Sequence, residues 1–145
     1  FGIELLDKYK GSYSWSGFVP QQQLPEIYQG ADIFALPSLS EGASMAMQEA
    51  MASGLPCIVS TNVGCILRDG VEGYVTPVGD VELLKDRIRQ LYFNPELRLA
   101  MGVAARARAE QFTWQEYERR LGLVYRNIVN GERELAMDFL DMTKS

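Results

Sequence analysis

The sequence predicts an α/β fold built on a doubly wound parallel sheet, followed by helices alone. Up to about residue 79, short apolar runs alternate with helical segments and turn residues, which is the order of βαβ units. Two of the runs, ADIFAL at 31–36 and PCIVS at 56–60, lack a polar alternation, as strands buried on both faces of a parallel sheet do. From residue 80 to about 131, apolar residues recur at helical spacing with two breaks.

Glycine, proline and hydroxyl residues mark the ends of the elements in the first half. Pro20 ends an expected strand, and Gly30 and Gly54 each follow an expected helix, where glycine commonly ends helices. Ser44 is placed to cap the second of these helices. The expected elements are a strand at 12–19, a helix at 22–29, a strand at 31–36, a helix at 45–53, a strand at 56–60 and a strand at 73–78.

Ligands of doubly wound, Rossmann-like sheets bind beyond the carboxyl ends of the strands. We therefore expect the site in the loops that follow the strands. These loops are Pro20–Gln23, Pro37–Ser44, Thr61–Gly64 and Val78–Asp80.

The second half predicts three helices with recognisable starts. Asp80 caps the first, Asn94 caps the second ahead of a first-turn proline, and Thr113 with Glu116 forms a capping box for the third. We expect residues 1–131 to form one domain and 132–145 a C-terminal tail or helix. The third helix is expected to bury its apolar face, which consists of Trp114, Tyr117, Leu121, Val124, Tyr125 and Ile128.

Composition excludes several classes of protein. The 145 residues are 47% hydrophobic and 23% charged, which suits one folded domain with a core. The net charge of −5 argues against nucleic acid as a partner, and the absence of histidine excludes His-based catalysis and the common zinc sites. Cys57 and Cys65 are expected to be buried thiols in a reducing cytoplasm. The sequence has no apolar run long enough for a transmembrane segment and no signal peptide.

The segment from Pro37 to Ser60 carries two carboxylates in unusual places. Glu41 lies in the loop before a helix, where an acid can simply complement the helix dipole. Glu49 lies inside that helix among methionines and alanines, where a carboxylate is costly unless it has a partner. A pair of ligand hydroxyls, a backbone cap or an arginine would each serve as that partner.

The run PSLSEGASMAMQEAMASGLP at 37–56 resembles the donor-site signature of retaining, nucleotide-sugar-dependent glycosyltransferases of the GT-B fold, family four, also called glycosyl transferases group 1. The resemblance covers nearly all of residues 15–125. Its other parts are Ser16–Pro20, Ile27–Asp32, Gly64, Asp69–Gly70, Gly73–Tyr74, Pro77–Asp80 and Phe112–Trp114.

The resemblance implies a nucleotide-sugar donor site. It places the ribose hydroxyls on Glu49 and the nucleobase near Phe18, Val19 and Pro20. A helix start also offers free N–H groups and a positive dipole end to a diphosphate, independently of the resemblance. The residues that the resemblance places against the sugar and the diphosphate are Glu41, Gly42, Ala43, Ser44 and Met45.

The implied reaction is transfer of a hexose from a nucleoside-diphosphate sugar to an acceptor hydroxyl with retained configuration. It implies neither a metal nor another cofactor, and it assigns no residue of this chain as catalytic. The chain begins at Phe1 in what resembles the end of a helix, so we expect the first strand and an N-terminal acceptor domain upstream. In the family, an Arg and a Lys from that upstream part neutralise the diphosphate, so the chain alone is expected to be nearly inactive.

Two alternatives remain at this point. One is a GT-B nucleotide-sugar epimerase, and the other is a non-catalytic doubly wound ligand-binding domain. The expected location is the cytoplasm, with peripheral membrane attachment of the full-length enzyme as a variant.

Overall fold

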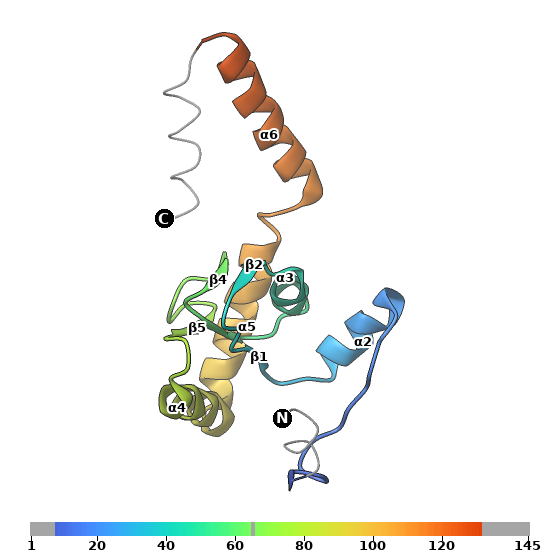
Figure 1. Ribbon diagram of the computed structural model, residues 1–145, viewed down its shortest axis with the longest axis vertical. Helices are drawn as coiled ribbons and strands as arrows, with labels where there is room; N and C mark the ends of the chain where they lie inside the picture. The colour runs from blue at the N-terminus through green and yellow to red at the C-terminus, as the bar shows by residue number, and fades with distance from the viewer. Residues whose placement is uncertain (1–7, 65, 132–145) are drawn as a thin grey trace.

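A parallel sheet of three strands forms the centre of the molecule (Figure 1). The computed structural model describes residues 8–64 and 66–131. The strands β1 (Phe34–Leu36), β3 (Cys57–Ser60) and β5 (Gly73–Thr76) lie in the order β1-β3-β5, with both pairs parallel. This arrangement confirms the predicted α/β class, because parallel neighbours require crossover connections, and the one from β1 to β3 contains the helix α3.

The helices begin where the sequence places their caps. The side-chain oxygens of Ser44, Asp80, Asn94 and Thr113 each accept a hydrogen bond from a backbone N–H in the first turn of the helix that follows. All four predicted caps are therefore confirmed. The helices are the 3₁₀ turn η1 (Gln21–Gln23), α2 (Leu24–Gln29), α3 (Met45–Ala52), α4 (Val81–Phe93), α5 (Pro95–Ala109) and α6 (Trp114–Val129).

The core lies on both faces of strand β3. Cys57 and Val59 point to one face and belong to the cluster formed with the buried side of α3. Ile58 points to the other face and joins a cluster with Tyr74 of β5 and with residues of α4 and α5. Because side chains alternate along a strand, apolar residues at successive positions bury both faces. The sheet is therefore doubly wound, as the two uninterrupted apolar runs predict.

Residues 12–19 do not form the predicted strand. This segment has no strand partner among the described residues, and its aromatic side chains are exposed, with Phe18 at 93%. Aromatic and hydroxyl residues fit a pleated, half-buried surface, but their strand preference depends on neighbours that can pair. The strand prediction for 12–19 is wrong, because this segment pairs with neither edge strand of the described sheet, β1 or β5.

The predicted environment of α6 is also wrong. The helix has the expected start and bounds, yet none of its residues is buried, and Trp114 is 67% exposed. Figure 1 shows α6 extending from the end of α5 away from the sheet. An amphipathic pattern identifies the apolar face of a helix but not what covers it. The tail at 132–145 lies outside the described residues.

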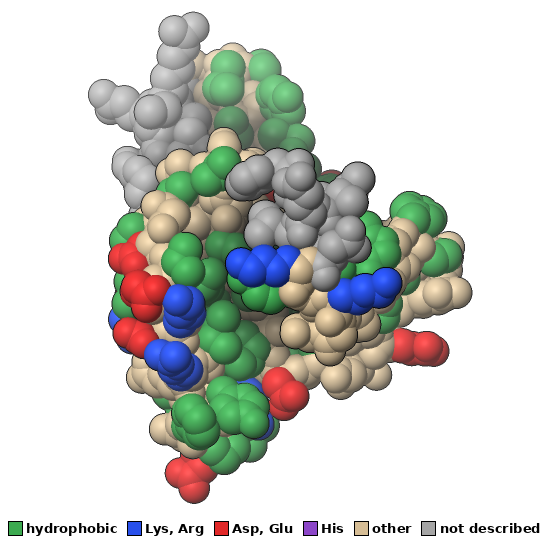
Figure 2. Space-filling model, turned by 60° about the horizontal axis from the view of Figure 1, so that its bottom comes forward, with side chains coloured by type: hydrophobic (Ala, Val, Ile, Leu, Met, Phe, Trp, Pro, Cys, Tyr) green, Lys and Arg blue, Asp and Glu red, His purple; other side chains and the backbone are tan. Residues whose placement is uncertain are grey.

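The surface mixes apolar and charged side chains. On the face drawn in Figure 2, acidic and basic side chains are interspersed between hydrophobic ones.

Within residues 8–64 and 66–131, no helix has both the length and the apolar character needed to cross a membrane.

Candidate functional site

The loops after β1 and β3 are joined by a second, small parallel sheet. Its strands are β2 (Glu41–Ala43) and β4 (Val63–Gly64), in segments that the sequence predicts as loops. The Glu41 amide donates to the Asn62 carbonyl at 3.1 Å, and the Asn62 side-chain amide donates to the Leu39 carbonyl at 2.9 Å. These bonds fix the chain that leads into α3, at the edge of the sheet where the carboxyl ends of β1 and β3 meet.

Gly64 allows the two loops to approach closely. A Cβ atom at Gly64 would lie 2.9 Å from the carbonyl oxygen of Gly42, whereas a Cβ at Gly42 would meet nothing within 4 Å. Gly64 therefore has a structural role. The space beside Gly42 is open to solvent or to a ligand.

Helix α3 begins with two unsatisfied amides. The Ser44 hydroxyl, which is buried, accepts a hydrogen bond from the Met47 amide at 3.3 Å. The amides of Met45 and Ala46 have no acceptor among the described residues. Free N–H groups and the positive end of the helix dipole make this turn suitable for an anion.

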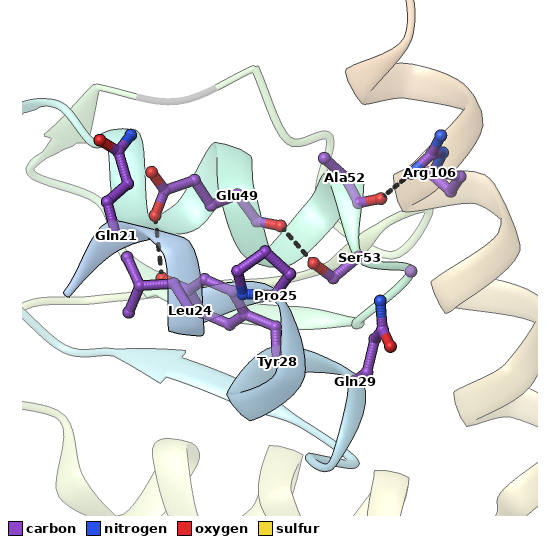
Figure 3. Close-up of a pocket in the computed structure, with 10 residues that line it drawn as sticks. Gln21, Leu24, Pro25, Tyr28, Gln29, Glu49, Ala52, Ser53 and Arg106 are labelled. Atoms are coloured by element: carbon purple, nitrogen blue, oxygen red, sulfur yellow. Dashed lines mark hydrogen bonds between the residues drawn. The ribbon is translucent and has the colours of Figure 1, made fainter. Parts of the chain in front are cut away.

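Glu49 lies one turn further along α3 and opens into a pocket of about 650 Å³ (Figure 3). The side chain is half-buried, and its Oε2 atom accepts a hydrogen bond from the Tyr28 hydroxyl at 3.2 Å. Its Oε1 atom has no partner among the described residues. Met45 and Glu49 are four residues apart on one helix, so they lie on neighbouring positions of the same face. The lining residues are Gln21, Leu24, Pro25, Tyr28, Gln29, Glu49, Ala52, Ser53, Gly54 and Arg106.

Tyr28 is a neutral hydrogen-bond donor to Glu49. Burial raises the pKa of the Tyr28 phenol to about 12, and the charge of Glu49 and the hydrogen bond to it add to the effect. All these causes favour the protonated phenol. The hydroxyl therefore keeps its proton at any physiological pH.

A second hollow of about 570 Å³ lies between the first half of α3 and the start of α6. Its wall is largely apolar and includes two residues predicted to contact the donor, Ala43 and Met45. The lining residues are Ala43, Met45, Gln48, Ile66, Phe112, Thr113, Trp114, Glu116, Tyr117, Arg120, Leu121 and Val124.

The predicted site residues do not share one pocket. Glu41 and Gly42 are exposed on β2, and Glu49 lies in the pocket of Figure 3. Pro20 precedes η1, whose first residue, Gln21, lines the same pocket. Of the predicted nucleobase neighbours, Val19 is half-buried and Phe18 points into solvent. Their proposed contacts with a ligand remain predictions.

Sequence reasoning assigned no role to Tyr28, and it included Gln21 only as part of the expected site loop Pro20–Gln23. Tyr28 lies in Ile27–Asp32, one of the segments that resemble the glycosyltransferase family. That resemblance was the only indication from sequence, and it does not show that the Tyr28 hydroxyl contacts Glu49. No three His, Cys, Asp or Glu side chains in the described part of the chain are grouped closely enough to hold a metal ion.

Fold and site together define a doubly wound α/β domain with a pocket lined by residues of α2, α3 and α5. Residues 6–108 match the family described as glycosyl transferases group 1. The chain belongs to this family of glycosyltransferases.

Individual relatives agree with this assignment. A D-inositol 3-phosphate glycosyltransferase of Corynebacterium diphtheriae is 36% identical over 109 residues, which are 73% of this chain and 25% of the relative. The sulfoquinovosyl transferase SQD2 of Arabidopsis thaliana is 33% identical over 107 residues, or 70% of this chain and 21% of the relative. The chain thus spans about a quarter of the length of these relatives.

A solved structure supports the fold. The sucrose-phosphate synthase of Thermosynechococcus elongatus superposes with a TM-score of 0.79 at 25% identity, covering 89% of this chain and 34% of the synthase. The fold is that of the GT-B glycosyltransferases.

Proposed function

We propose that this chain binds the nucleoside-diphosphate sugar of a hexosyl transfer that proceeds with retained anomeric configuration. The observation that carries the proposal is the placement of Glu49. Its carboxylate has one oxygen free within the described residues and opens into a pocket, one turn from two free amides at the start of the same helix. A half-buried carboxylate in apolar surroundings needs a partner, and a ribose diol supplies two hydroxyl donors.

The spacing along α3 suits the parts of a nucleotide. Ribose hydroxyls would donate to Glu49, and the diphosphate would lie against the amides of Met45 and Ala46. At a rise of about 1.5 Å per residue, the first turn and Glu49 are about 6 Å apart along the helix axis, roughly the separation of a ribose ring from its second phosphate. The positive end of the helix dipole would lie at the phosphates, and the ribose hydroxyls would contact the Glu49 carboxylate.

The sugar and the base would extend from this helix in opposite directions. The exposed strand β2 places Glu41, Gly42 and Ala43 beyond the start of α3, where the hexose would lie. The base would lie at the other end, near Pro20 and Gln21, since Gln21 lines the pocket of Glu49. Ser44 would act indirectly, because its hydroxyl is already used as the helix cap.

The proposed reaction breaks the bond between the anomeric carbon and the diphosphate oxygen and forms one to the acceptor oxygen on the same face. The acceptor loses its proton, and the nucleoside diphosphate leaves with the bonding electrons. Charge stabilisation is usually the largest catalytic contribution; this chain would supply the part that comes from the helix dipole, and the Arg and Lys expected upstream would supply the rest. We propose that an N-terminal acceptor domain completes the enzyme, that no metal takes part, and that these 145 residues bind donor with almost no turnover.

Calorimetric titration with UDP, GDP and ADP tests the proposal. We expect one of the three to bind at millimolar strength or better, and Glu49→Ala to weaken it by about tenfold or more, because hydrogen bonds to a charged group contribute about 1.5–3 kcal/mol. Glu26→Ala, on the exposed side of α2, is the matched control and should bind as the parent does. Equal affinity of the Glu49→Ala variant and the parent would remove ribose binding from Glu49.

A further inference from the structure

The contact between Tyr28 and Glu49 joins two separate elements across the pocket (Figure 3). Tyr28 comes from α2, Glu49 comes from α3, and the two residues are 21 positions apart. The helices α2 and α3 pack on one another, so the hydrogen bond adds a polar link to an apolar contact. Its acceptor is the oxygen Oε2 of Glu49, and the other oxygen faces the pocket without a described partner.

Packing fixes the direction of the Tyr28 hydroxyl. The ring meets Phe34 of β1 edge-on, with centroids 6.2 Å apart and planes at 65°, and it packs against the core cluster beneath α3. A side chain that is held on several sides loses its alternative rotamers. The ring therefore acts as a rigid support, and the hydroxyl lies at its end.

Glu49 has no such support of its own. A glutamate side chain has several rotatable bonds and loses considerable rotamer freedom when a ligand fixes it. No cation pairs with the Glu49 carboxylate in the described part of the chain, so Tyr28 supplies its one described side-chain hydrogen bond.

We propose that Tyr28 is a positioning residue, which holds Oε2 of Glu49 so that Oε1 faces the hydroxyls of the donor ribose. The inference rests on the proposed function, in which Glu49 binds that ribose. Holding the carboxylate in its binding orientation before the ligand arrives increases affinity, because less freedom is lost on binding. The phenol remains a donor at neutral pH, since its pKa is raised to about 12.

The test compares Tyr28→Phe with the parent chain on two ligands. The first is whichever of UDP, GDP and ADP binds best, and the second is its 2′,3′-dideoxy form. Tyr28→Phe keeps the ring and its packing on Phe34 and removes only the hydroxyl. We expect it to weaken the ribonucleotide by about tenfold, the lower end of the range for one hydrogen bond to a charged group, and to leave the dideoxy nucleotide unchanged.

Tyr74→Phe is the matched control. Tyr74 is a buried tyrosine of β5 whose ring lies under Arg87, outside the pocket of Glu49. This variant should bind both nucleotides as the parent does. A general loss of packing in Tyr28→Phe would weaken both nucleotides alike, which distinguishes a structural role from positioning.

The outcomes separate the two proposals. If the parent binds both nucleotides equally, or neither, ribose recognition by Glu49 fails and the role of Tyr28 fails with it. If the parent prefers the ribonucleotide while Tyr28→Phe has the same preference, the proposed function stands and the positioning role is overturned.

A measurement without ligand checks the contact itself. Burial is the largest cause of the raised pKa of Tyr28, and the charge of Glu49 and the hydrogen bond to it add to the effect. Glu49→Gln should therefore lower that pKa from about 12 part of the way toward the usual value near 10. The phenol is followed by ultraviolet absorbance, and its signal is assigned by subtracting the titration of Tyr28→Phe. An unchanged titration in Glu49→Gln would show that the two side chains do not interact, and would overturn the proposal.

Discussion

Gly42 of β2 and Gly64 of β4 lie close together in the small sheet, but their surroundings differ. A Cβ atom at Gly64 would come within 2.9 Å of the Gly42 carbonyl, so alanine there forces the two strands apart. A Cβ at Gly42 would enter open space, in the region where the proposed hexose lies. A substitution at Gly64 therefore tests the packing of the two strands, and a substitution at Gly42 tests the space for the ligand.

Gly42→Ala is expected to leave stability within about 0.5 kcal/mol of the parent and to weaken a nucleotide sugar more than the matching nucleoside diphosphate. Gly64→Ala is expected to lower the melting temperature, since its added methyl meets backbone that cannot move alone. Thermal unfolding and calorimetric titration provide the two measurements. Unchanged affinity of Gly42→Ala for the nucleotide sugar would show that the sugar does not approach β2.

The residue scale also shows what sequence can predict about the site. The position of Glu49 inside a helix follows from the spacing of its apolar neighbours, and Ser44 is recognisable as a cap. The partner of Glu49 is not recognisable in this way. Tyr28 reaches it through the packing of α2 on α3, and a contact 21 positions apart leaves no periodic signal.

Among the elements, the turn before β5 contains an ion pair with a buried carboxylate, which the sequence pattern does not reveal. The Glu72 side chain is fully buried, and its Oε2 accepts from the Arg68 amide at 2.7 Å. Its Oε1 accepts from the Arg68 guanidinium at 3.0 Å and 2.5 Å. The hydrogen bonds and the charge of Glu72 raise the pKa of Arg68. The pair fixes the chain that enters β5.

Arg68→Ala should destabilise the chain more than the loss of an exposed ion pair does, because it leaves the buried Glu72 carboxylate without its counter-ion. Arg89→Ala is the matched control. It removes an exposed pair with Asp86 at 3.5 Å and should cost less than about 1 kcal/mol. Urea unfolding measures both variants, and equal free energies of unfolding would contradict a structural role for the Arg68–Glu72 pair.

For helix α6, the sequence predicts the start and the apolar face correctly but not the burial of that face. The Thr113 cap is present, with the Glu116 amide donating to it at 3.2 Å. The second hydrogen bond of a capping box would run from the Thr113 amide to the Glu116 carboxylate. Here the Glu116 carboxylate pairs instead with Arg119 and Arg120, and their hydrogen bonds lower its pKa to about 2. The apolar face is also in the predicted register, yet it is exposed. Burial of a helix depends on its neighbours, and periodicity in its own sequence carries no information about them.

For the whole molecule, the order of strands and helices was enough to predict a doubly wound sheet. The prediction succeeded because β3 is apolar at every position and both of its faces are covered. It missed the pairing of β2 with β4, since strands of two or three residues are too short to show alternation. That pairing connects the two loops beside the proposed site.

The central claim is that Glu49 and the first amides of α3 hold one nucleotide. Amide chemical shifts of the isotope-labelled chain, recorded while the best-binding nucleoside diphosphate is added, test it most directly. The claim predicts that the largest shifts fall on Met45, Ala46 and Glu49, with smaller ones at Gln21 and Tyr28. Shifts confined to α6, or a helix α3 that does not respond at saturating nucleotide, would contradict it.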